Sequence, residues 1–186
     1  GKAVQNKTTL YVASNGSDSN TGLTSDSALA SINKVIDKIN ALNDEEKDYI
    51  IEVNGEILGP QTIVDTSETE KIKANSISIT GKNTSSANLA DIINANLGEN
   101  ETGSALTIDT KVPVTLYYIG ITGGHGNEIG SGTAARIAGG GLYIRNNATV
   151  SLEGKTHIYE NTNFYGSTTV SGAGGGIYVG ENAMLH

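Results

Sequence analysis

The sequence predicts an all-β fold in which one winding chain stacks short parallel strands as a solenoid, with an amphipathic capping helix near the N-terminus. Three observations lead to this prediction. A motif recurs at a nearly constant distance in the C-terminal half. Twenty-four glycines accompany one Phe, one Met and no Trp, which favours many short strands and tight turns around an aliphatic core. Only one segment of the 186 residues has convincing helical periodicity.

Charge and cysteine content exclude several functional classes. The net charge is −8 and only 17% of the residues are charged, so no basic surface is offered to nucleic acid or to anionic lipid. The absence of cysteine excludes disulfide bonds and thiolate metal sites. No apolar run approaches the ~20 residues of a membrane-spanning helix, and residues 1–10 lack the apolar core of a signal peptide. We therefore expect no nucleic-acid partner and no membrane insertion of this segment.

The N-terminal part, residues 1–48, combines a strand, a polar loop and the predicted capping helix. TTLYVA at residues 8–13 is rich in β-formers, and the loop that follows is dense in Ser, Asn, Asp and Gly. In ALASINKVIDKINAL, residues 28–42, apolar side chains recur at helical spacing. The first turn can be capped by Ser25, Asp26 or Ser27. One face of this helix is apolar, so we expect it to cover part of the core.

Residues 49–186 are expected to form coils of short strands, within a single domain overall. YIIEV at 49–53 and SISIT at 76–80 have strand character, and no second amphipathic helix of adequate length flanks them. A sheet with helical crossovers is therefore disfavoured. The sequence stops at His186, inside a copy of the repeated motif, so we expect the chain to be a C-terminally truncated part of a longer protein.

The repeated motif predicts which strands are neighbours. SALTIDTKVPVTL, GGLYIRNNATVSL and GGIYVGENAMLH align so that Leu106, Leu142 and Ile177 correspond, at offsets of 36 and 35 positions. A nearly constant period of this length indicates stacked repeats. Equivalent strands should then lie parallel, ~4.8 Å apart, with their aliphatic residues in a buried row. Asn147 and Asn182 fall at one corner, where Asn tolerates left-handed backbone.

These segments resemble the right-handed parallel β-helix proteins of pectin-lyase type. YVASNGSDSNTGLTSDSALASINKVIDKI is similar to the opening segment of exported bacterial members, in which a helix plugs the end of the solenoid. GGGLYIRNNATVSL, HIYENT and GGGIYVGENA resemble the coils of bacterial surface proteins, including polymorphic outer-membrane and adhesin-like passengers. The resemblance implies a β-helix fold. It also implies that any enzyme activity would be cleavage of acidic polysaccharides on an outer strand face.

Asp109 and Arg145 are the best catalytic candidates that the sequence offers. Outward positions alternate with the buried row, so the two residues should lie on one face, one coil apart. However, hydrolysis by paired acids needs a second carboxylate, and a catalytic Ca²⁺ needs six to eight oxygens. A stacked surface salt bridge is therefore the favoured interpretation of this pair.

Two further groups of residues are candidates for binding. Tyr143 and Tyr178 should form an outward aromatic pair that can stack on a sugar ring or anchor a protein partner. Cross-strand tyrosines also stabilise a sheet without any ligand. We expect no cofactor. The loop after residue 14 carries hard oxygen donors of the kind that bind Ca²⁺, but Asx turns explain these donors better. These donors are Asp18, Asn20 and Asp26.

Two hypotheses for function follow from these features. The first is a non-enzymatic extracellular or cell-surface module, adhesin-like or a scaffold, which contacts a glycan or a host or neighbour surface protein. The second is a fragment of a polysaccharide lyase or glycan-binding protein that uses the outer face around Asp109, Tyr143 and Arg145.

Overall fold

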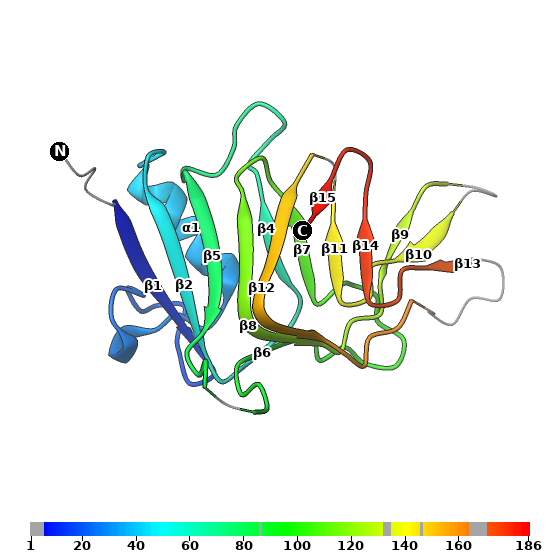
Figure 1. Ribbon diagram of the computed structural model, residues 1–186, viewed down its shortest axis with the longest axis horizontal. Helices are drawn as coiled ribbons and strands as arrows, with labels where there is room; N and C mark the ends of the chain where they lie inside the picture. Colours follow the sequence, from blue (N-terminus) through cyan, green and yellow to red (C-terminus); the bar gives the residue numbers. More distant parts are fainter. Residues whose placement is uncertain (1–5, 86, 132–134, 146, 164–170) are drawn as a thin grey trace.

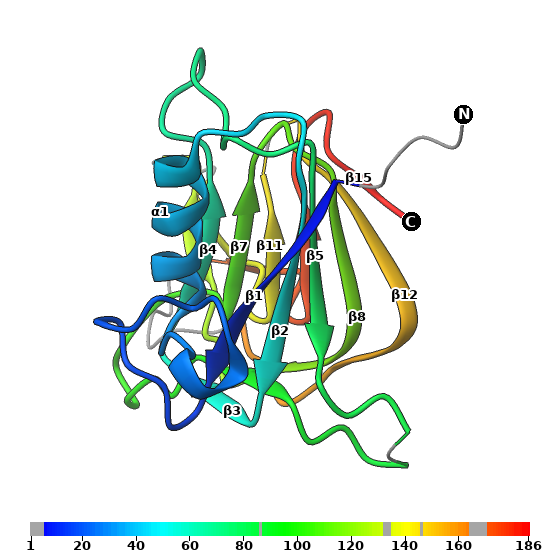
Figure 2. The same ribbon diagram turned by 90° about the vertical axis from the view of Figure 1, so that its left-hand side faces the viewer.

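The computed structural model describes residues 6–85, 87–131, 135–145, 147–163 and 171–186. Two parallel sheets face each other across one hydrophobic core, and helix α1 stands along one end of them (Figure 1, Figure 2). The chain passes repeatedly from one sheet to the other, so strands that are distant in sequence become neighbours.

Among the described residues, the strands form two large sheets and one small sheet. Sheet A contains, in spatial order, β1 (Lys7–Ala13), β2 (Asp48–Asn54), β5 (Ser76–Gly81), β8 (Val114–Thr122), β12 (Thr149–Ile158) and β15 (Met184–Leu185), with β3 (Glu56–Leu58) pairing to β6 (Ile92–Asn94) and β6 to β8. Sheet B contains β4 (Gln61–Val64), β7 (Leu106–Asp109), β11 (Leu142–Ile144) and β14 (Ile177–Val179). The small sheet contains β9 (Asn127–Ile129), β10 (Arg136–Ala138) and β13 (Ser171–Ala173).

The pairing of β7, β11 and β14 confirms the predicted register of the repeat. Leu142 is paired with Leu106 on one side and with Ile177 on the other, in parallel strands. Leu106 and Leu142 have no exposed surface, because alternate residues of each strand point into the core. Asn147 and Asn182 both have left-handed backbone, with φ of 65° and 57°. Equivalent positions of successive copies therefore occupy equivalent places in the structure.

The expected fold class, an all-β right-handed parallel β-helix solenoid, is nevertheless wrong. In the described part of the chain the fold is mixed α/β, with mostly parallel sheets A and B, one α-helix and no closed or solenoid sheet. The buried face of α1 belongs to the same core as the strands, and β9 pairs antiparallel to β10. A sequence repeat indicates which strands are neighbours, but it does not determine how separate sheets join around a core.

Helix α1 (Ile32–Leu42) begins later than the sequence predicts. Ser31 is its N-cap, and the Ser31 side chain accepts a hydrogen bond from the Lys34 N–H at 3.2 Å. The expected caps lie instead in a separate 3₁₀ helix, η1 (Ser25–Ser27). The helix ends at Asn43, whose left-handed backbone has φ of 52°. Its buried face consists of Ile32, Val35, Ile36 and Ile39.

Side-chain hydrogen bonds attach α1 to the edge strand β4. The Gln61 Oε1 atom accepts from the Ile32 N–H at 2.8 Å, and Gln61 is 2% exposed. Asn33 Oδ1 accepts from the Thr62 N–H at 2.7 Å and from the Thr62 hydroxyl at 2.9 Å. Asn33 thus satisfies a backbone N–H at the sheet edge, and Gln61 satisfies a backbone N–H at the start of the helix. Figure 2 shows α1 standing directly beside β4.

A buried carboxylate also fixes the corners where β2 and β5 end. Asp91 has no exposed surface. Its Oδ1 accepts from the Gly55 N–H at 2.9 Å, and its Oδ2 accepts from the Asn83 N–H at 2.7 Å. The Asn83 side-chain amide donates to both oxygens at 3.2 Å. Asp91 therefore joins the β2–β3 corner and the loop after β5 to the start of β6, and these bonds offset the cost of burying the carboxylate.

We expect Gln61→Leu to lower the free energy of unfolding by about 1–3 kcal/mol, because the buried Ile32 N–H loses its acceptor while the side-chain volume is kept. Urea unfolding followed by circular dichroism measures this change. Asp37→Ala on the exposed face of α1 is the matched control and should change the value by no more than about 0.5 kcal/mol. Equal effects of the two substitutions would contradict the role given to Gln61.

Candidate functional site

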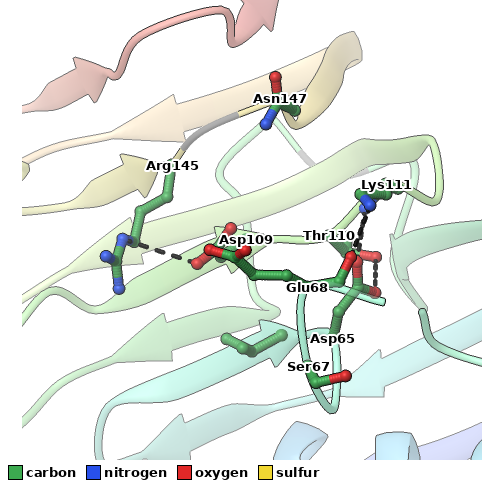
Figure 3. A pocket seen from close by; sticks show the side chains of 9 residues that line it. Asp65, Ser67, Glu68, Asp109, Thr110, Lys111, Arg145 and Asn147 are labelled. Atoms are coloured by element: carbon green, nitrogen blue, oxygen red, sulfur yellow. Dashed lines mark hydrogen bonds and ion pairs between the residues drawn. The ribbon is translucent and has the colours of Figure 1, made fainter. Parts of the chain in front are cut away.

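Asp109 and Arg145 lie together on the outer face of sheet B, as the sequence predicts. Asp109 ends β7, and Arg145 follows directly after β11, which pairs with β7. The Arg145 Nε atom is 3.6 Å from Asp109 Oδ2, and the two side chains are 49% and 30% exposed. Figure 3 shows the two side chains pointing toward each other. Such a half-exposed ion pair contributes little to stability.

Arg145 is also held by an aromatic pair. Its guanidinium lies over the Tyr143 ring, 5.8 Å from the ring centroid, which is within the range of a cation–π interaction. The rings of Tyr143 and Tyr178 are 5.5 Å apart and inclined at 50°. Tyr178, Tyr143, Arg145 and Asp109 therefore form a continuous row of contacts across β14, β11 and β7. Both tyrosines lie side by side as predicted.

Tyr143 is more buried than the sequence suggests. It is 9% exposed, and burial raises the pKa of its phenol above the ordinary value, although nearby Arg145 acts in the opposite direction. Gly139 approaches it closely, since a Cβ atom added there would lie 2.7 Å from the Tyr143 Cβ. Tyr143 is thus a support for Arg145 and not an open stacking platform, whereas Tyr178 is half-buried.

A groove of about 430 Å³ opens beside this ion pair, at the ends of β4 and β7 (Figure 3). We call it the Arg145 groove; it is lined by Val64, Asp65, Ser67, Glu68, Asp109, Thr110, Lys111, Arg145 and Asn147. A second depression of about 370 Å³ also includes Arg145 and Tyr143, together with Thr107 and residues 127–130. Arg145 therefore borders both hollows.

Asp65 builds the groove, although no motif in the sequence singles it out. Its Oδ1 accepts from the Thr110 hydroxyl at 2.6 Å and from the Ile72 N–H at 2.9 Å, and its Oδ2 accepts from the Lys111 N–H at 2.9 Å. The Lys111 ammonium donates to the Glu68 carbonyl at 2.6 Å. These bonds tie the 65–72 loop to the end of β7. The only sequence signal is an Asp directly after a strand, which is common in turns.

Two properties of the Arg145 groove decide its chemistry. Three carboxylates, of Asp65, Glu68 and Asp109, face two cations, Lys111 and Arg145. Within the described part of the chain, no group accepts a hydrogen bond from the Arg145 side chain, whose contacts are the ion pair and the Tyr143 ring. The two terminal nitrogens of Arg145 thus remain planar donors without an acceptor among the described residues.

The three candidate calcium ligands lie in the segment that precedes α1. Asp18 Oδ1 accepts from the Ala30 N–H at 3.0 Å and from the Ser31 hydroxyl at 3.1 Å. The Asn20 side-chain amide donates to the Ala28 carbonyl at 2.9 Å, and Asp26 lies in η1. Among the described residues, no group of three or more His, Cys, Asp or Glu side chains is placed to hold a metal ion.

We expect Asp65→Ala to lower the free energy of unfolding by about 2–4 kcal/mol, because three donors lose their acceptor. Asp109→Asn should change it by less than about 1 kcal/mol, because the ion pair that it weakens is solvent-exposed. Urea unfolding of both variants measures these free energies. It tests whether Asp65 stabilises the groove while Asp109 is available to a ligand. A larger loss for Asp109→Asn than for Asp65→Ala would reverse these roles.

No protein-family model matches the chain, and a search of curated proteins found no similar sequence. Across the described ranges, no helix has both the length and the apolar character needed to cross a bilayer.

Proposed function

We propose that this chain is a non-enzymatic binding module of the cell surface or extracellular space, and that the Arg145 groove holds a neutral glycan. The observation that carries the proposal is the position of Arg145. Its guanidinium is fixed between the Tyr143 ring and Asp109, and its remaining donors are free of other described groups. A surface of Ser, Thr, Asn and Gly with few charged residues suits an exposed location.

The polar groups of the groove suit a ligand with many hydroxyl groups. A sugar hydroxyl both donates and accepts, so it can bond to the Arg145 guanidinium and to an Asp109 or Glu68 carboxylate oxygen at once. The planar guanidinium can also donate in parallel to two adjacent oxygens, which fixes the orientation of the ligand. The volume of about 430 Å³ lies within the range typical of small-ligand sites.

Charge favours a neutral glycan over an acidic one. The groove carries three carboxylates against two cations, and the whole chain has a net charge of −8. A polyuronate or sulfated chain would be repelled by both the groove and the surrounding surface. A neutral chain meets no such repulsion, because it can be bound by hydrogen bonds alone.

The use of the carboxylates favours binding over cleavage. Hydrolysis by an acid pair needs two carboxylates free to exchange protons with the substrate. Asp65 accepts three hydrogen bonds from the protein, and Asp109 is paired with Arg145. Glu68 is then the only carboxylate of the described groove without such a partner, which supports a binding role.

We expect Arg145→Ala to weaken binding of a neutral oligosaccharide at least about tenfold, which corresponds to about 1.4 kcal/mol. A glycan array of neutral and acidic chains identifies the ligand, and titration calorimetry with each variant measures its affinity. Lys34→Ala, which removes an exposed cation on α1, is the matched control and should bind as the native chain does.

Three results would contradict the proposal. They are the absence of binding to any neutral glycan on the array, unchanged affinity in Arg145→Ala, and release of unsaturated or reducing products from a bound chain. The last result would support the polysaccharide-cleaving alternative, provided that Asp109→Asn or Glu68→Gln abolishes it.

A further inference from the structure

The outer face of sheet A carries ordered rows of side chains on the side of the molecule away from the Arg145 groove. One row, which we call the hydroxyl row because four of its five side chains carry a hydroxyl group, consists of Thr9, Ile50, Ser78, Thr115 and Ser151, each directly opposite the next. The adjacent row, which we call the Tyr/Glu row, consists of Tyr11, Glu52, Thr80, Tyr117 and Glu153. Because paired residues of neighbouring strands lie opposite one another, both rows run across sheet A from β1 to β12; Figure 1 shows these strands side by side.

A depression of about 560 Å³ lies on this face, over β2, β5, β8 and β12. Its floor is formed by small half-exposed side chains, chiefly Ser78, Thr80 and Thr115. Tyr117 and Glu153 border it on one side, and Lys7, Asp48 and Ser76 border it on the other. We call this depression the sheet A groove. Among the described residues, the hydroxyl groups of Ser78, Thr80 and Thr115 make no hydrogen bond, so they can bond to a ligand.

Tyr117 is held in place by an irregular stretch of backbone. Its ring packs edge-on against Tyr118, with centroids 4.6 Å apart and planes at 70°. A bulge between Glu153 and Thr156 makes room for both rings. Gly154 in that bulge has φ of +59°, and a Cβ atom there would lie 2.5 Å from each ring. The aromatic ring is therefore pre-positioned, and its direct partner across the strands is the exposed carboxylate of Glu153.

We propose that the sheet A groove docks an extended peptide segment through a Lys or Arg side chain, with the cation placed between the Tyr117 ring and the Glu153 carboxylate. An aromatic face beside a carboxylate suits an ammonium or guanidinium group, which gains from both the ring quadrupole and the ion pair. The apolar stem of such a side chain can lie along the hydroxyl row while its charged end reaches Glu153.

Charge complementarity favours this occupant over a glycan. The groove and its flank carry Asp48, Glu52 and Glu153 against Lys7, within a chain of net charge −8. Asp48 is held ionised, because hydrogen bonds from Ser76 and then Asn75 lower its pKa. The unbonded hydroxyls of the floor can accept from peptide N–H groups and donate to peptide carbonyls. A neutral glycan would use the hydroxyls but would gain nothing from the negative potential.

Binding of a fluorescently labelled Lys/Ser peptide, followed by fluorescence polarisation, tests the proposal. The matched probe is the same peptide with every Lys acetylated, which removes the charge and should abolish binding. Glu153→Gln and Tyr117→Leu should each weaken binding of the charged peptide at least about fivefold, and Tyr117→Phe, which keeps the ring, should not. Glu99→Gln removes the same charge from an exposed loop and should bind as the native chain does.

Ser78→Lys is a second test in case Tyr117→Leu fails to fold. It places a cation in the sheet A groove and should abolish peptide binding. Its circular dichroism spectrum should stay native. Equal weakening by Glu153→Gln and Glu99→Gln would overturn the proposal in favour of general charge attraction. So would binding of the acetylated peptide, or binding of a neutral glycan in place of either peptide. Arg145→Ala should leave peptide binding unchanged, so this inference and the glycan proposal can fail separately.

Discussion

The hydrogen-bonded register between parallel strands is the constraint on which the rest of the structure depends. Once Leu142 is paired with Leu106 and Ile177, the residues of β11 must alternate between the core and the outer face of the sheet. A slip of one residue would exchange the two faces. The buried aliphatic rows and the outer rows that carry Arg145, Tyr117 and Glu153 are therefore consequences of the same backbone pairing.

Parallel pairing leaves unsatisfied backbone groups wherever a strand ends or a sheet has an edge. Long-range polar side chains meet this need in the described residues. Gln61 and Asn33 join α1 to β4, Asp91 joins two corners to β6, and Asp65 joins a loop to β7. These residues hold the ends of the strands in place, which leaves the half-exposed groups between them available for ligands. The polar residues that stabilise the strand ends are thus different from those that we propose to bind ligands.

Local periodicity predicted much of this arrangement from the sequence. The apolar face of α1, the strands near residues 49–53 and 76–80, the neighbours of β11 and the Asp109–Arg145 pair all follow from the spacing of residues. The predicted β-helix fold is wrong because the spacing of residues does not determine how the two sheets join around the core. The burial of Tyr143 and the roles of Asp65 and Asp91 depend on segments distant in sequence, so no local pattern indicates them. The N-cap was misplaced because several Ser residues precede the helix.

Disulfide trapping tests the register most directly, because the native chain contains no cysteine. Ser78 and Thr115 are directly opposite in β5 and β8, at a strand separation of about 4.8 Å that suits a disulfide bond. We expect Ser78→Cys/Thr115→Cys to form an intramolecular disulfide on mild oxidation. Thr80→Cys/Thr115→Cys, two residues out of register, should stay reduced. Efficient bridging of the second pair with none of the first would contradict the register and every surface derived from it.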